Sequence, residues 1–133
     1  MMNKIKNLTI IDDDDLYVML IKMNIELTKL VEKTEVFVNG LEAINFLKEN
    51  ANNINELPDI ILLDINMPIM HGWQFLSEYI KLNPLARKKI TIYVCSSSIS
   101  PDDIARAKSI SEVSDYIIKP VSKEKLTNLL LTL

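Results

Sequence analysis

Short apolar runs alternate with amphipathic segments along the chain. Five runs have the length of a strand, and they cover residues 8–11, 33–38, 60–63, 89–95 and 115–118. After each run, apolar residues recur every three or four positions, which predicts helices over 16–28, over 40–49, from Gly72, from Pro101 and after Ser122. This alternation predicts an α/β fold, a doubly wound parallel sheet with helices on both faces. Two strand orders are common for such sheets, and periodicity does not choose between them.

In the first helix, apolar residues recur at helical spacing, which is typical of a stripe that faces the core. The stripe consists of Leu16, Met19, Leu20, Met23 and Leu27. The expected faces of the later helices are Leu41, Ile44 and Leu47; Trp73, Leu76 and Ile80; Ile104, Ala107 and Ile110; and Leu126, Leu129, Leu130 and Leu133.

Polar residues mark where the helices begin. Asn39, Ser100 and Ser122 are expected N-caps, and Asp14 and Asp15 suit the start of the first helix as capping or dipole-compensating residues. The pair Asn83–Pro84 is expected to end the third helix.

Composition changes this picture little. The 133 residues are 48% hydrophobic and 25% charged, which predicts one globular domain over residues 1–133 with no output module. A net charge of -3 gives no reason to expect nucleic acid or an anionic membrane as a partner. The single cysteine, Cys95, fits a reducing cytoplasm, and neither a signal peptide nor an apolar run long enough to span a membrane is present in the sequence.

Charged and hydroxyl side chains follow four of the predicted strands, namely Asp12 and Asp13, Asp64, Ser96 and Lys119. The carboxyl ends of parallel strands share one edge of a sheet, so we expect these residues to converge there. Two carboxylates about 4 Å apart repel by about 4 kcal/mol at an effective dielectric constant of 20. A hard cation such as Mg2+ would relieve that repulsion. No glycine-rich phosphate loop accompanies the acids, which suggests that a phosphoryl group arrives from elsewhere.

Four motifs in order carry a resemblance to a known family: IIDDDD, LLDINMPIMHG, CSSS and DYIIKP. With them, the chain resembles the receiver domain of two-component response regulators, in particular the stand-alone, CheY-like receivers. The resemblance covers essentially the whole chain and implies the strand order 2-1-3-4-5, cytoplasmic location, and a signalling domain in place of a conventional enzyme.

The resemblance also implies a role for each matching residue. Asp64 would accept a phosphoryl group from a phosphohistidine. Asp13 would bind Mg2+ directly, Asp12 would bind it directly or through water, and Asn66 would offer its backbone carbonyl. Lys119 would pair with the phosphoryl oxygens.

The family's switch would consist of Ser96, which moves toward the phosphoryl group, and Tyr116, which turns inward in response. Three serines in a row leave a one-residue shift open for Ser96, and Tyr116 has the alternative of an ordinary strand residue. The Lys119–Pro120 peptide bond is implied to be cis.

The implied partners are a histidine kinase or histidine phosphotransfer protein and a downstream target protein. The target would bind the face of the fourth helix, fifth strand and fifth helix, near Ile104, Lys108, Tyr116 and Lys125. The oligomeric state would be a monomer or weak dimer. An intermediate carrier in a multistep phosphorelay is an alternative with the same chemistry.

Other functions fit the sequence less well. A phosphohydrolase of the dehalogenase type needs a second aspartate two residues after its nucleophile, where this chain has Asn66. A nucleotide-binding fold needs glycines after the first strand, and the two glycines of the chain are Gly40 and Gly72. His71 fits an exposed loop residue better than a phosphorylated histidine, and Cys95 and Trp73 fit packing roles.

Overall fold

A computed structural model describes residues 5–82 and 88–133, and these form one five-stranded parallel sheet. Its strands are β1 (Ile5–Ile11), β2 (Val31–Phe37), β3 (Ile60–Leu63), β4 (Thr91–Ser96) and β5 (Val113–Ile118). Its helices are α1 (Asp15–Thr28), α2 (Gly40–Glu49), α3 (Gly72–Leu82), α4 (Pro101–Ser109) and α5 (Lys123–Leu131). The strand order is β2-β1-β3-β4-β5, the order that the resemblance implies.

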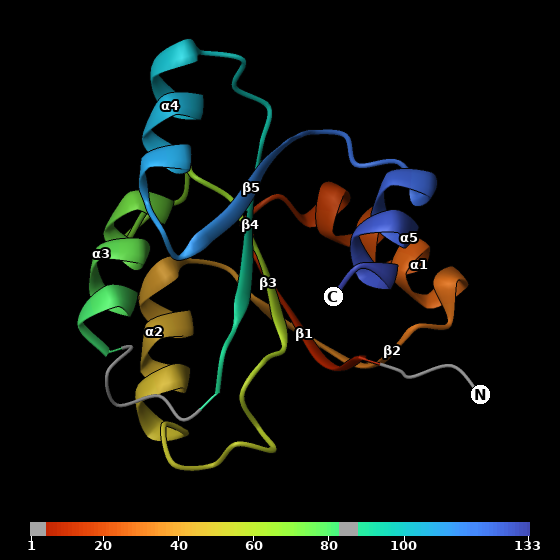
Figure 1. The fold of residues 1–133 in the computed structure, drawn as a ribbon, viewed down its shortest axis with the longest axis horizontal. Helices are drawn as coiled ribbons and strands as arrows, with labels where there is room; N and C mark the ends of the chain where they lie inside the picture. The colour runs from red at the N-terminus through yellow and green to blue at the C-terminus, as the bar shows by residue number, and fades with distance from the viewer. Residues whose placement is uncertain (1–4, 83–87) are drawn as a thin grey trace.

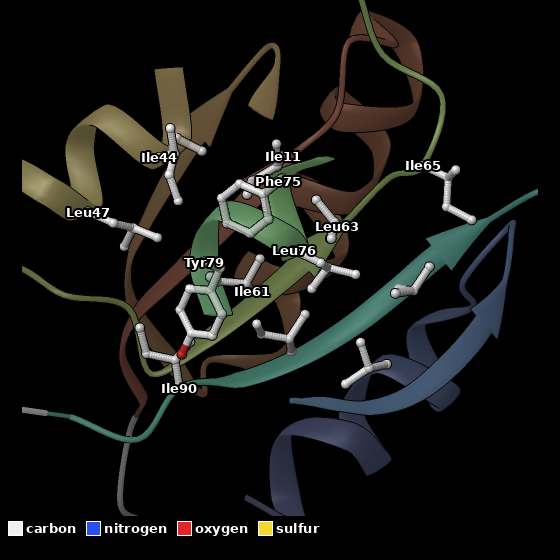
Figure 2. Close-up of a cluster of buried hydrophobic side chains, with 14 of the residues drawn as sticks. Ile11, Ile44, Leu47, Ile61, Leu63, Ile65, Phe75, Leu76, Tyr79 and Ile90 are labelled. Carbon is white, nitrogen blue, oxygen red and sulfur yellow. The ribbon is translucent and has the colours of Figure 1, made fainter. Parts of the chain in front are cut away.

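The helices form a layer on each side of the sheet. Helices α1 and α5 lie together on one side, and α2, α3 and α4 cover the other (Figure 1). Each layer has its own apolar cluster. The larger one joins Phe75 and Tyr79 of α3 and Ile44 of α2 to the sheet residues Ile11 and Ile61 (Figure 2). The smaller one packs α1 and α5 on the opposite face.

The central strands are apolar because both of their faces are covered. All four residues of β3 are buried, and the last five residues of β1 are buried as well. Strand pairing extends beyond the apolar runs, because backbone groups continue the ladder where side chains are polar. Thus β1 begins at Ile5, where it pairs with Val31, and β5 begins at Val113. Boundary differences from the sequence prediction are two or three residues at most at these ends.

The predicted burial of the α1 stripe is wrong. Helix α1 exposes Leu16 (63%), Leu20 (50%) and Met23 (53%), together with Met19 and Leu27. It buries Ile21 and Ile25 instead. The helix has two apolar stripes on opposite sides, because at 100° per residue Ile21 and Ile25 point away from the first set. We call the exposed set (Leu16, Met19, Leu20, Met23, Leu27) the outer stripe.

Most of the other predicted helix faces are buried, with exceptions at their edges. The exposed exceptions are Leu41, Ile80 and Leu133. Leu133 lies beyond the last turn of α5, and the half-buried Ile110 caps α4.

The predicted caps are largely confirmed. Asn39 accepts a hydrogen bond from Glu42 N at 2.9 Å, and Ser122 accepts one from Lys125 N at 3.1 Å. Ser100 occupies the N-cap position of α4, but its side chain makes no capping hydrogen bond. The expected stop signal at residues 83–84 lies outside the described residues.

Candidate functional site

Three carboxylates gather at the carboxyl edge of the sheet. Asp12 follows β1 and Asp64 follows β3, and the parallel ladder continues through their backbones. The N–H of Asp12 donates to Phe37 O at 3.0 Å, and that of Asp64 donates to Ile11 O at 2.9 Å. One carboxylate oxygen each from Asp12, Asp13 and Asp64 lies within 4.8 Å of the others. Asp12 and Asp64 are buried, whereas Asp13 is exposed.

Lys119 brings a positive charge to this cluster from the end of β5. Its backbone N–H donates to Ser96 O at 2.9 Å, which fixes the residue beside β4. Its Nζ lies 2.7 Å from Asp12 Oδ2 and 3.3 Å from Asp64 Oδ1. Burial alone would lower the pKa of Lys119, but the hydrogen bond and charge of Asp12, helped by Asp64, raise it above its ordinary value. Lys119 therefore remains an ammonium group. The Lys119–Pro120 peptide bond is cis.

The cluster has more negative than positive charge. Burial, and then the charge of Asp12, raise the pKa of Asp64 to about 6, while Lys119 acts in the opposite direction. Three carboxylates against one ammonium leave a site that a divalent cation would complement. Oxygen donors of this kind suit a hard cation.

The loop between β3 and α3 is held tightly against Asp64. The N–H of Gly72 donates to Ile65 O at 2.8 Å. A Cβ at position 72 would lie 2.5 Å from Asp64 O, so only glycine fits this close approach. Asn66 lies on the same loop and, with Asp13, lines an open hollow of about 430 Å³ beside the cluster.

His71 and Trp73 also line this hollow. His71 is exposed, and its Nδ1 accepts the N–H of Gln74 at 3.2 Å, as a capping residue would. Trp73 is half-buried, and its ring stacks under the guanidinium of Arg106 on α4, with 4.5 Å between the Arg106 Cζ and the ring centroid.

The hydroxyl residues predicted from the sequence are connected through Ser98. Of the three consecutive serines, Ser96 is the buried one, and its Oγ accepts the N–H of Ser98 at 3.0 Å. Tyr116 is buried, and its hydroxyl donates to Ser98 O at 2.8 Å. The Ser98 hydroxyl in turn donates to Asp103 Oδ2 at 2.7 Å. One loop residue therefore contacts both Ser96 and Tyr116 and ties them to α4.

Sequence reasoning overlooked Tyr17 and Asp103. Tyr17 lies on the inner side of α1, and its ring centroid is 4.2 Å from Lys119 Nζ. Pattern reading does not find such a contact, because the two residues are 102 positions apart in the sequence. Asp103 lies in the first turn of α4, and nothing in the sequence pattern predicts the hydrogen bond that it accepts from Ser98. Cys95 is buried beneath the site, and burial raises the pKa of its thiol to about 12, so the group remains neutral and packs as part of the core.

The fold and the site geometry define the chain as a CheY-like α/β protein with an acidic site at the sheet edge. Comparison with known proteins agrees. The family model described as the response regulator receiver domain matches residues 8–131. The crystal structure of a two-component response regulator from Cytophaga hutchinsonii superposes with a TM-score of 0.86 at 33% identity, covering 98% of this chain and 100% of that one.

Two curated relatives differ greatly in length. The probable methanogenesis regulatory protein FilR2 of Methanothrix harundinacea is 31% identical over 88% of this chain and 74% of its own length. The sensor histidine kinase CheAY of Helicobacter pylori is 39% identical over 67% of this chain, which matches only 10% of that protein.

This chain belongs to the response regulator receiver domain family of two-component signalling. The family consists of signalling domains and not of conventional enzymes. Among residues 5–82 and 88–133, none of the helices has the length and apolar character needed to cross a membrane.

Proposed function

We propose that the protein is a phosphorylation-dependent switch whose acceptor is Asp64. The observation that carries the proposal is the position of Lys119 Nζ between Asp12 and Asp64, within a cluster of three carboxylates. Phosphoryl transfer depends mainly on positioning and charge neutralisation, and this arrangement offers both.

The donor is a phosphohistidine on a histidine kinase or a histidine phosphotransfer protein. A carboxylate oxygen of Asp64 attacks phosphorus, a P–O bond forms, and the P–N bond to the imidazole breaks. The imidazole leaves with the electron pair and takes a proton from solvent. Near neutral pH most Asp64 side chains are ionised despite the raised pKa of about 6, so the attacking oxygen is available.

The donor atoms fit Mg2+, which Asp12, Asp13, Asp64 and the backbone carbonyl of Asn66 would hold. When bound, Mg2+ neutralises charge on the phosphoryl oxygens. Lys119 Nζ pairs with one of the same oxygens, and it is already held at the acceptor carboxylate.

Ser96 and Tyr116 would couple phosphorylation of Asp64 to a structural change at the protein surface. A phosphoryl group on Asp64 adds acceptor oxygens for the Ser96 hydroxyl. Movement of Ser96 breaks its hydrogen bond from Ser98 N, and Ser98 also holds Tyr116 and Asp103. The change therefore reaches α4 and β5, where a target protein would bind close to Lys108 and Lys125, both exposed.

Acetyl phosphate and Mg2+ followed by intact-mass measurement test the proposal. We expect the wild-type chain to gain one hydrolysable phosphoryl group and Asp64→Asn to gain none. Asp102→Asn is the matched control, because Asp102 is exposed and outside the cluster, and it should be labelled like wild type. An unlabelled wild type, or a label that persists in Asp64→Asn, would overturn the proposal.

A further inference from the structure

Tyr17 lies beside the acidic site, in the first turn of α1. Asp14 caps α1, and its Oδ1 accepts the N–H of Tyr17 at 3.1 Å. This capping hydrogen bond fixes the backbone of Tyr17 in the first turn of α1, and the side chain packs against the core cluster beneath the helix. Its ring centroid lies 4.2 Å from Lys119 Nζ.

The ring completes the enclosure of the Lys119 ammonium group. Asp12 and Asp64 contact Nζ at 2.7 Å and 3.3 Å, and the Tyr17 ring contacts it as well. The Lys119 side chain is only 14% exposed. A lysine side chain has four flexible carbons and no fixed geometry of its own, so its ammonium group needs surroundings that restrict it. A cation held over an aromatic face is stabilised most where water is excluded.

The hydroxyl group of Tyr17, unlike its ring, makes no favourable contact with the site. It is buried and finds no hydrogen-bond partner within the described part of the chain. A buried hydroxyl without a partner costs free energy. The part of Tyr17 that acts favourably on the site is therefore its aromatic face.

We propose that Tyr17 is a positioning residue for phosphoryl transfer, whose ring holds the Lys119 ammonium group in place against Asp12 and Asp64. The proposal rests on the proposed acceptance of a phosphoryl group at Asp64. It adds that part of the site's charge neutralisation depends on an aromatic side chain from α1, which binds neither metal nor phosphoryl group.

Two substitutions at one position separate the ring from the hydroxyl. Tyr17→Phe keeps the ring, and Tyr17→Leu removes it but keeps an apolar side chain. We expect Tyr17→Phe to be phosphorylated by acetyl phosphate at the wild-type rate at saturating Mg2+. Tyr17→Leu should be about five-fold slower, which corresponds to about 1 kcal/mol of lost cation–π stabilisation. Equal rates for Tyr17→Leu and wild type, or a Tyr17→Phe variant as slow as Tyr17→Leu, would overturn the proposal.

A second readout does not depend on phosphorylation. A ring face shields the nuclei beneath it, so the ε-methylene protons of Lys119 should be shifted upfield in NMR spectra of the unphosphorylated protein. The upfield shift should persist in Tyr17→Phe and disappear in Tyr17→Leu. The backbone amide spectra should show that both variants are folded. If the ε-methylene protons of Lys119 are not shifted in wild type, the contact between the Tyr17 ring and Lys119 is overturned. Failure of wild type to be phosphorylated, with the upfield shift of Lys119 intact, would overturn the function of Asp64 and leave the ring–ammonium contact standing, so the two failures are distinguishable.

The final control asks whether the effect of Tyr17→Leu on the phosphorylation rate requires Lys119. In a Lys119→Met background, Tyr17→Leu should cause no further loss of phosphorylation rate, because the cation that the ring holds is absent. A repeated five-fold loss in that background would show that Tyr17 acts by another route and would overturn the proposal.

Discussion

Asp64 is the residue at which burial and the proposed function conflict most directly. The pKa of its carboxyl group is raised from 3.8 to about 6 in the folded protein, first by burial and then by Asp12. The folded state therefore binds this proton more tightly than the unfolded state does. The stability that the neutral carboxyl contributes is fully present below about pH 4 and is lost as the pH rises through 6. At neutral pH the ionised Asp64 carboxylate destabilises the fold.

Because ionisation of Asp64 lowers the stability of the folded state, Asp64→Asn, whose side chain cannot ionise, should be more stable than wild type at neutral pH. With a chelator present to remove metal ions, the variant should be about 1–2 kcal/mol more stable than wild type at pH 7.5. This figure already allows for the partial exposure of the Asp64 carboxylate to solvent. The difference should shrink toward zero near pH 4. Urea unfolding at the two pH values measures it, with Asp102→Asn as the exposed control. A variant less stable than wild type at pH 7.5 would contradict the assigned environment of Asp64.

At the scale of single elements, α1 divides its apolar residues between two sides. Ile21 and Ile25 are buried against the sheet, whereas Met23 in the outer stripe is 53% exposed. Ile25→Ala should destabilise the protein by about 2–4 kcal/mol, because it leaves a cavity in the smaller core cluster. Met23→Ala should change stability by less than about 0.5 kcal/mol. Urea unfolding of both variants compares the two sides of one helix, and equal losses would mean that the outer stripe is packed.

The same helix marks the limit of what the sequence predicts. The carboxyl ends of the strands and caps such as Asn39 depend on neighbouring residues, so the sequence predicts them, and it also predicts that Asp12 and Asp64 lie at the edge of the sheet. Both stripes of α1 have helical spacing, and only the three-dimensional packing decides which one the sheet covers. The contact of Tyr17 with Lys119 is equally a product of tertiary structure, because it joins α1 to the end of β5.

At the scale of the whole molecule, the sheet concentrates negative charge that the fold alone does not neutralise. Four residues from three strand ends supply three carboxylates and one ammonium group, and each strand is fixed in register by its neighbours. Moving these strand ends apart would break the central ladder, so the fold keeps the four charged residues on one edge of the sheet. The folded chain should therefore gain stability from a divalent cation that the unfolded chain does not bind.

We accordingly expect Mg2+ to raise the stability of wild type, by about 2.7 kcal/mol when the free ion is at one hundred times its Kd. Asp13→Asn should lose most of this gain, because it removes one donor. Asp15→Asn should retain it, because Asp15 is exposed in the first turn of α1, outside the cluster. Thermal unfolding across a Mg2+ titration measures all three chains. An Asp15 variant that loses the gain as fully as the Asp13 variant would indicate a diffuse attraction of the ion to acidic residues. Selective loss in Asp13→Asn would mean that the sheet has built a localised site, which is the condition that the proposed phosphoryl transfer to Asp64 requires.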